Sequence, residues 1–250
     1  TDGGTTFGTV TNMTLNSPST NPPPLCSAAF DDYDCRGFPK VYANGTNAYV
    51  VWQDDSTYQT TGDATSTGDV YYRKISYSAS STTWTITPPL TSAPTILNTD
   101  TNTDSDYAFA PIIAASATSG YVHVVWSGTG VTTSDDKLYH RRSADSGANF
   151  GVTTHLSPGL TNAGIIKNPD IAVDGSKIYV AWQDYLGGTT SPPDILFTAS
   201  SDNGATFNGG TAGNAGTPKD LSSTNIASPD TNDSLHPQVA AAGGKVYVVW

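Results

Sequence analysis

The chain contains no glutamate, and this absence is its most informative compositional feature. All 22 acidic residues are Asp. Glu favours helices, whereas Asp favours turns, because its short side chain bonds to nearby backbone amides. Long apolar runs and a 3.6-residue apolar period are absent as well. Short apolar runs separated by Gly, Asn, Ser and Thr therefore predict an all-β fold.

Basic residues are also scarce. Lys and Arg total 11, the net charge is −11 and the isoelectric point is about 4.4. Phosphate backbones and anionic lipids repel such a surface, which argues against a nucleic-acid partner and against a basic membrane-binding face. No apolar run reaches the roughly 20 residues that a membrane span requires.

Cysteine is limited to Cys26 and Cys35, which stand in one short Asp-rich loop. A disulfide between them would stabilise the fold by about 2 to 3 kcal/mol. The even cysteine count, the few Lys and three N-glycosylation acceptors predict an extracellular or cell-surface protein. The acceptors are Asn12, Asn44 and Asn232. The alternative is a cytosolic protein with two free, buried thiols.

What the chain does have is a repeat. A Pro-x-[Ile/Val] start followed by a Trp recurs from one end to the other, with the pairs Pro39 and Trp52, Pro111 and Trp126, Pro169 and Trp182, and Pro237 and Trp250. Tandem units of several short strands are typical of propeller blades. We therefore predict one β-propeller domain over 1–250, made of four-stranded antiparallel blades.

The repeats run approximately over 1–24 (the end of a blade), 38–107, 108–166, 167–235 and 236–250 (the start of a blade). The sequence thus opens and stops in mid-repeat. Either the two end pieces belong to one incompletely closed ring, or the chain is a segment of a longer protein, which we favour.

A closing motif ends the repeats. Ser200-x-Asp202-x-Gly204-x-Thr206-Phe207 is repeated as Ser143-x-Asp145-x-Gly147-x-Asn149-Phe150, in part as Asp2-x-Gly4-x-Thr6-Phe7, and in degraded form up to Trp84. It resembles the Asp-box, or bacterial neuraminidase repeat, of sialidase-like β-propellers. In such a turn the Asp accepts backbone N–H bonds and the Gly supplies a positive φ. We therefore interpret Asp2, Gly4, Asp145, Gly147, Asp202 and Gly204 as structural residues.

The resemblance also implies an enzymatic site that this chain does not match. Sialidases use three Arg, a Tyr nucleophile primed by a Glu, and an Asp acid/base. The chain has no Glu and four Arg, and Arg36-Gly37-Phe38-Pro39 is an imperfect Arg-Ile-Pro motif. A Tyr without a carboxylate base is a poor nucleophile. We assign no catalytic residue and lean against an enzyme.

Asp and Asn also alternate ahead of three repeats. Asp32 and Asp34, Asp104 and Asp106, and Asp230 and Asn232 stand seven and five residues before the repeat's Pro, and Asp100 and Asn102 extend the second array. Oxygens at alternate positions of a curled loop can bind Ca²⁺, which takes six to eight of them. The alternative is that these residues form Asx-turns between blades.

These observations favour a non-catalytic extracellular or cell-surface β-propeller that has a structural or binding role and is calcium-stabilised and glycosylated. Its expected partners are other surface proteins or glycans, and the oligomeric state is left open. The alternatives are a sialidase-like glycoside hydrolase with its catalytic residues outside this segment, and a carbohydrate-binding propeller.

Overall fold

The computed structural model describes residues 13, 37–54, 69–98, 107–117, 119–130, 133–158, 160, 165–186, 192–223 and 232–250. Every regular element in these ranges is a β-strand. None of them contains a helix that could span a membrane.

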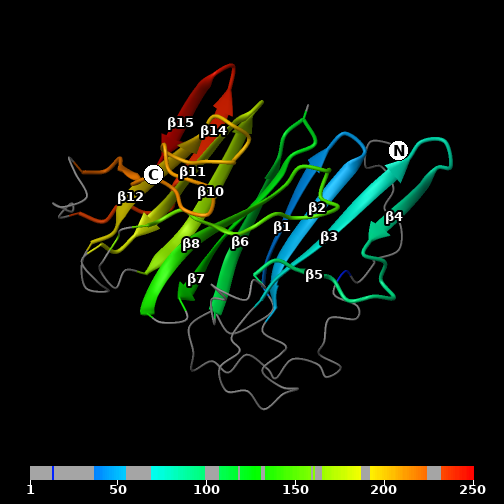
Figure 1. Cartoon of the computed structure of the whole chain (residues 1–250), viewed down its shortest axis with the longest axis horizontal. Helices are drawn as coiled ribbons and strands as arrows, with labels where there is room; N and C mark the ends of the chain where they lie inside the picture. The colour runs from blue at the N-terminus through cyan, green and yellow to red at the C-terminus, as the bar shows by residue number, and fades with distance from the viewer. Residues whose placement is uncertain are drawn as a thin grey trace, which may run out of the picture.

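The strands form four antiparallel sheets that follow one another along the chain, and each is called a blade (Figure 1). Blade 1 contains β1 (Gly37–Asn44), β2 (Asn47–Asp54), β3 (Asp69–Ser78), β4 (Thr83–Thr87) and β5 (Thr95–Ile96). Blade 2 contains β6 (Tyr107–Ala115), β7 (Val122–Gly130), β8 (Thr133–Ser143) and β9 (Thr154–His155). Blade 3 contains β10 (Ile166–Asp174), β11 (Lys177–Asp184), β12 (Asp194–Ser200) and β13 (Lys219–Asp220). Blade 4 contains β14 (Gln238–Ala242) and β15 (Lys245–Val249).

The second strand of each complete blade is apolar on both faces because it lies between two neighbours. In β7, Val124 and Trp126 pack in the core shared with blade 1, whereas Val125 packs in the core shared with blade 3. Side chains alternate along a strand, so a run such as VHVVW serves both cores. Trp126 and Trp182 therefore face the preceding blade.

The first strands lie against one another from blade to blade. β1 contacts β6, β6 contacts β10 and β10 contacts β14, and the blades fan out in an open arc (Figure 1). This is a β-propeller of four-stranded antiparallel blades, and the described sheets do not close into a ring. The predicted fold class is confirmed.

Polar side chains join the blades at the hairpins between first and second strands. Asn44 Nδ2 donates to the Ser116 carbonyl at 2.8 Å, and Asp174 Oδ2 accepts from Gly244 N at 2.6 Å. These two hydrogen bonds connect the hairpins of blades 1 and 2 and those of blades 3 and 4.

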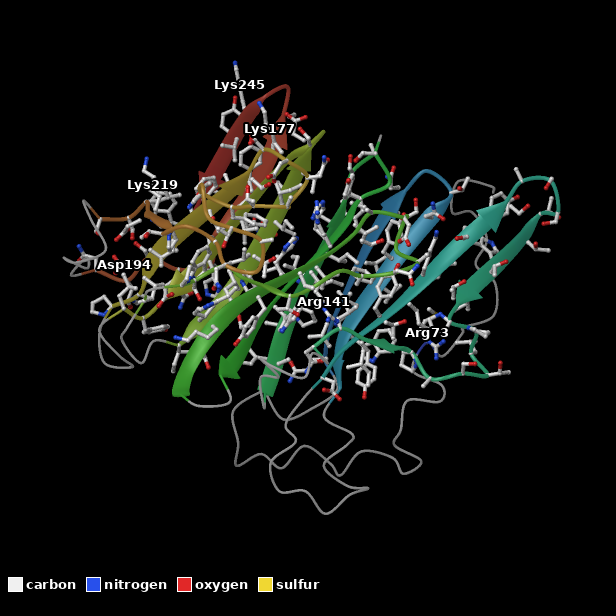
Figure 2. The ribbon with its side chains drawn as sticks, in the orientation of Figure 1. Arg73, Arg141, Lys177, Asp194, Lys219 and Lys245 are labelled. Carbon is white, nitrogen blue, oxygen red and sulfur yellow. The ribbon has the colours of Figure 1, made fainter. Side chains whose placement is uncertain are left out.

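Blade 1 departs from the expected repeat after its third strand. The degraded motif that ends at Trp84 is instead a hairpin, in which β4 pairs with β3 and Thr82 has a φ of 54°. Trp84 is 63% exposed, and the centre of its ring lies 4.8 Å from that of Tyr77, whereas Phe207 in the blade 3 motif is fully buried. Beneath this hairpin the buried Arg73 donates to the carbonyls of Pro88, Pro89 and Ser92 (Figure 2). The expected motif at Trp84 was wrong because this segment lacks the Asp and Gly that make the turn.

Candidate functional site

The blades meet at the end where first strands begin and second strands finish. Gln53 Oε1, at the end of β2, accepts from Ala110 N of blade 2 at 3.4 Å. Gln183 Oε1, at the end of β11, accepts from His236 N of blade 4 at the same distance. Both Gln side chains are buried. One glutamine after the repeated Trp thus binds the start of the next blade's first strand.

The backbone at these positions is strained. Ala110, Asn168 and His236 each precede the repeat's Pro and have φ values of 50°, 51° and 54°. The first two stand at β-bulges, where β6 and β10 shift register against their partners. A left-handed conformation costs a non-Gly residue about 1 to 2 kcal/mol, and such strain concentrates at functional sites. The side chains of Asn168 and His236 are both exposed.

These two side chains belong to a polar group that we call the Asn168 cluster, consisting of Lys167, Asn168, Gln183, Tyr185 and His236. Asn168 Nδ2 donates to Gln183 Oε1 at 3.2 Å and lies 3.2 Å from His236 Nδ1. Gln183 Nε2 donates to the Tyr185 hydroxyl at 3.1 Å. Lys167 Nζ lies 5.9 Å from the centre of the Tyr185 ring. The cluster offers amide, imidazole, phenol and ammonium groups beside an aromatic face, and no carboxylate.

A carboxyl group lies buried beside this cluster. Asp184 follows Gln183 and is 3% exposed, and its Oδ2 accepts from Trp182 Nε1 at 3.0 Å. Burial raises the pKa of Asp184 to about 7, with smaller contributions from the Asp136 and Asp194 carboxylates. Neighbouring Asp136 accepts from Ile166 N at 3.2 Å, and buried Asp194 accepts from Ser222 Oγ at 3.2 Å. Asp184 therefore binds a proton at a higher pH than an exposed carboxyl group does.

The closing motifs lie at the opposite end of the blades, and we call residues 143–150 and 200–207 the closing turns. Asp202 accepts from Ser200 Oγ at 2.7 Å, from the backbone N of Ala205 and Thr206 at 3.0 and 2.9 Å, and from Thr206 Oγ1 at 2.7 Å. Asp145 makes the same four contacts, with Asn149 Nδ2 in place of the Thr hydroxyl. These bonds lower the pKa of both carboxyls to about 2. Both Asp side chains serve the turn itself.

Each closing turn rests on two ring side chains of the preceding blade, which we call a ring pair. Gly147 lies on Tyr49 and Tyr72, and its carbonyl accepts from the Tyr72 hydroxyl at 3.1 Å. Gly204 lies on His123 and His140, whose ring nitrogens Nδ1 and Nε2 are 3.1 Å apart. An added Cβ would overlap the Tyr72 hydroxyl in the first case and approach both imidazoles to 3.0–3.1 Å in the second. Glycine is therefore required for close approach as well as for its positive φ.

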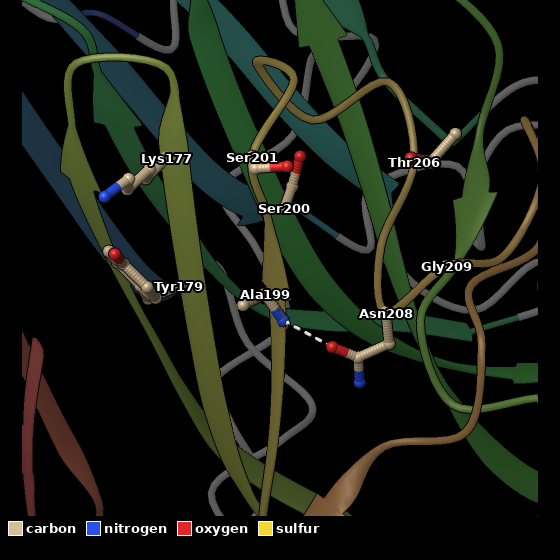
Figure 3. A pocket seen from close by; sticks show the side chains of 8 residues that line it. All are labelled: Lys177, Tyr179, Ala199, Ser200, Ser201, Thr206, Asn208 and Gly209. Atoms are coloured by element: carbon tan, nitrogen blue, oxygen red, sulfur yellow. Dashed lines mark hydrogen bonds between the residues drawn. The ribbon is translucent and has the colours of Figure 1, made fainter.

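A pocket of about 340 Å³ lies at this closing-turn end of blade 3 (Figure 3). Lys177, Tyr179, Ser201 and Asn208 line it. Asn208 Oδ1 accepts from Ala199 N at 3.1 Å, which fixes one wall. Since Lys177 begins β11 and Gln183 lies near its end, the pocket and the Asn168 cluster occupy opposite ends of the blade.

Most residues predicted to bind calcium lie outside the described ranges. These are Asp32, Asp34, Asp100, Asn102, Asp104, Asp106 and Asp230, whereas Asn232 is described and exposed. In the part of the chain that the structure describes, no group of three or more His, Cys, Asp or Glu could hold a metal ion. Cys26, Cys35, Asn12, Asp2 and Gly4 also fall outside. Of the glycosylation acceptors, Asn44 uses its Nδ2 in the bond to Ser116, and Asn232 is exposed.

The sequence interpretation missed the Asn168 cluster. A usable signal was present, because Gln follows the Trp in the first and third repeats and a polar residue precedes the Pro in the third and fourth.

No family model matches the chain, and no curated protein matches it. Solved structures do. An α-L-arabinanase of Penicillium chrysogenum, complexed with arabinobiose, is 12% identical with a TM-score of 0.51, and the match covers 88% of this chain and 60% of the arabinanase. An endo-arabinase of Bacteroides thetaiotaomicron is 15% identical (TM-score 0.47, 88% and 72% covered), and an α-L-arabinofuranosidase of Lactobacillus brevis is 9% identical (0.47, 82% and 61%).

The fold is that of β-propeller glycoside hydrolases. Only the first of these three likenesses has a TM-score above 0.5, and at 12% identity it shows the fold alone. The chain spans about three fifths of the length of that arabinanase.

Proposed function

We propose that this chain is a non-catalytic, carbohydrate-binding β-propeller whose ligand contacts the Asn168 cluster. The observation that carries the proposal is the exposed Asn168–His236 contact, which joins two strained residues of neighbouring blades. Amide and imidazole groups donate to and accept from sugar hydroxyls, and an aromatic face such as that of Tyr185 packs against a sugar ring. Glycosidases with the same fold, the Penicillium enzyme among them, support a carbohydrate ligand.

The chemistry of the cluster favours binding over hydrolysis. Glycoside hydrolysis uses two carboxyl groups that flank the scissile bond. The five cluster residues include none, the chain has no Glu, and Asp184 is buried and accepts from Trp182 Nε1.

A glycosidase is the second candidate function, and Asp184 is the observation that favours it. A carboxyl group whose pKa is about 7 can act as a general acid at neutral pH. Release of reducing sugar from arabinan, abolished by Asp184→Asn, would establish hydrolysis in place of simple binding.

The binding proposal is tested on an array of defined oligosaccharides, followed by calorimetric titration with arabinobiose and sialyllactose. Asn168→Gly and His236→Gly remove the side chains while keeping a residue that accepts positive φ. Each is expected to weaken binding about tenfold, the loss of one or two good hydrogen bonds. Thr82→Gly is the matched control, because Thr82 is exposed and has a φ of 54° in the blade 1 hairpin. Absence of glycan binding, or binding that both cluster variants leave intact, would refute the proposal.

Three further parts of the proposal rest on sequence. The protein is extracellular or at the cell surface, with Cys26 and Cys35 joined. The closing turns descend from sialidase-type Asp-boxes, which the matching bonds of Asp145 and Asp202 support.

The loop from Asp100 to Asp106 binds Ca²⁺. Asp104→Asn combined with Asp106→Asn should abolish a Ca²⁺-dependent rise in melting temperature, and a rise that persists would contradict this site.

A further inference from the structure

The backbone N–H of His236 determines which groups of the Asn168 cluster donate and which accept. This N–H can only donate, so the Gln183 side-chain atom that faces it at 3.4 Å is the oxygen Oε1. The other end of the same amide is then Nε2, which donates to the Tyr185 hydroxyl at 3.1 Å. Gln183 is buried and both ends of its amide are bonded, so the amide cannot reverse its orientation without losing these bonds.

The orientation of Gln183 also determines that of the exposed side chains. Gln183 Oε1 lies 3.2 Å from the Asn168 amide, so the Asn168 atom that faces it is the donor Nδ2. Asn168 Nδ2 also lies 3.2 Å from His236 Nδ1, and an amide NH₂ cannot accept. His236 Nδ1 is therefore the nitrogen without a proton, and the neutral imidazole carries its proton on Nε2.

These bonds leave a defined set of groups to a ligand. The Tyr185 hydroxyl proton, the His236 Nε2–H and Asn168 Oδ1 enter no hydrogen bond within the part of the chain that the structure describes. Two of the three are donors. Lys167 adds a positive charge over the Tyr185 ring, with its Nζ 5.9 Å from the ring centre. The cluster is therefore rich in donors and positively charged, on a chain whose net charge is −11.

A donor-rich site favours a ligand group that only accepts. A sugar hydroxyl both donates and accepts, whereas a carboxylate presents two acceptor oxygens, and hydrogen bonds to a charged group are about twice as strong as neutral ones. We propose that the ligand is a sugar acid, a uronate whose carboxylate accepts from His236 Nε2 and from the Tyr185 hydroxyl beside Lys167. The inference rests on the proposed carbohydrate-binding function and names its ligand class. Gln183 is then a positioning residue, which acts through Asn168 and Tyr185.

Calorimetric titration with trigalacturonate and with its methyl ester tests the ligand class, because the ester keeps the sugar and removes the charge. Trigalacturonate should bind about tenfold more tightly than the ester, which corresponds to one charge-assisted hydrogen bond. Tyr185→Phe keeps the aromatic ring and removes one donor, so the preference for the acid should fall below about threefold. Tyr77→Phe, on blade 1, is the matched control and should keep the preference.

The outcomes separate this inference from the binding proposal on which it rests. Equal affinity for acid and ester, with both weakened in Asn168→Gly, would overturn the uronate assignment and leave carbohydrate binding intact. Tighter binding of sulfated galactobiose than of trigalacturonate would overturn it as well, because the cluster would then favour a sulfate ester over a carboxylate. If no glycan binds, both proposals fail.

The hydrogen-bond pattern can be tested without a ligand. Imidazole ¹⁵N chemical shifts at pH 8 should show His236 with its proton on Nε2. Gln183→Met no longer orients Asn168 and should give a mixture of both tautomers, whereas Gln53→Met, at the corresponding position of blade 1, should leave the His236 signals unchanged. Melting curves confirm that these variants are folded. A proton on His236 Nδ1 in the original chain would overturn the inference whether or not a glycan binds.

Discussion

The contact between blades 1 and 2 and the contact between blades 2 and 3 place the same closing turn on different chemistry. Gly147 rests on two phenols and Gly204 on two imidazoles. Burial raises the pKa of Tyr72, so the first pair stays neutral at every physiological pH. Burial lowers the pKa of His123 to about 3 and that of His140 well below its usual value, so below pH 6.5 the second pair stays neutral only because of the fold.

The difference shows that residues within each closing turn determine its conformation, whereas the rings on which the turn packs are determined by the preceding blade. Each Asp orders its own turn through bonds within five residues, and both turns are alike to within 0.1 Å in their backbone bonds. The supporting rings come from the preceding blade and need only present a flat surface beside a Gly. The imidazoles do so with two buried nitrogens, His123 Nε2 and His140 Nδ1, that find no hydrogen-bond partner among the residues that the structure describes.

The largest effect on the free energy of unfolding is expected when the glycines of the closing turns are replaced by Ala. Gly147→Ala should lower the free energy of unfolding by about 3 kcal/mol, the sum of a left-handed Ala and overlap with the buried Tyr72 hydroxyl. Gly204→Ala should cost about 2 kcal/mol, because its Cβ approaches the His rings only to 3.0–3.1 Å. Urea unfolding measures both.

Gly175→Ala separates the two causes. Gly175 has a φ of 64° and nothing within 4 Å of an added Cβ, so only the backbone term of about 1 kcal/mol remains. Equal losses in all three variants would show that the rings do not approach the turns closely.

The second effect is acid sensitivity of the blade 2–3 contact. The folded-state pKa of His123 lies below the unfolded value of 6.5, so the unfolded chain binds more protons between pH 6.5 and about 3. The stability that neutral His123 provides is complete above pH 6.5 and is lost as the pH falls, by about 1.4 kcal/mol per pH unit for each imidazole. Between pH 7 and pH 5 the free energy of unfolding in urea should therefore fall by about 2 kcal/mol on account of His123. Asp184, whose pKa is raised to about 7, changes stability in the opposite direction over the same range, so the contribution of the His pair is read from the comparison with a variant that lacks it.

Replacing the ring pair tests that assignment. The double variant His123→Tyr, His140→Tyr copies the blade 1 pair and should lose most of this difference, whereas His236→Gln, at the exposed cluster, should keep it. An unchanged pH dependence in the double variant would place the acid-sensitive groups elsewhere.

The sequence was sufficient to predict the features that repeat along the chain and depend on residues close together in it. Trp52, Trp126 and Trp182 mark the second strands, and the Asp and Gly of each closing turn lie within a few residues of the groups they bind. The degraded motif at Trp84 misled because a final aromatic alone does not make the turn. The repeat marks Gln183, Asn168 and His236 as polar positions beside the Trp and the Pro, but it does not predict their contact, since Asn168 and His236 are far apart in the chain and meet only when blades 3 and 4 pack.

The third prediction concerns the turn carboxylates. Asp145→Asn and Asp202→Asn each replace one acceptor oxygen of an exposed turn, so each should cost about 1 kcal/mol, and the two should agree. The stability that these carboxylates provide is lost at a lower pH than that of the His pair, because both carboxyls have pKa values of about 2 against 3.8 in the unfolded chain. Stability from these groups is complete above pH 3.8 and is lost toward pH 2. Unfolding curves between pH 4.5 and 7 should therefore leave the Asn variants parallel to the original chain, and divergence in that range would contradict the assignment.

The smallest effect is expected where the two turns themselves differ. Asn149 Nδ2 donates to Asp145 Oδ2 at 2.8 Å, and Thr206 Oγ1 donates to Asp202 Oδ2 at 2.7 Å. Asn149→Thr should therefore change the free energy of unfolding by less than about 0.5 kcal/mol, because one donor replaces another at an exposed position. Asn149→Val keeps a branched side chain without the donor and should cost about 1 kcal/mol, the usual contribution of one hydrogen bond. If Asn149→Thr and Asn149→Val unfold at the same urea concentration, the side-chain donor adds nothing, and the backbone bonds to Asp145 alone hold the turn.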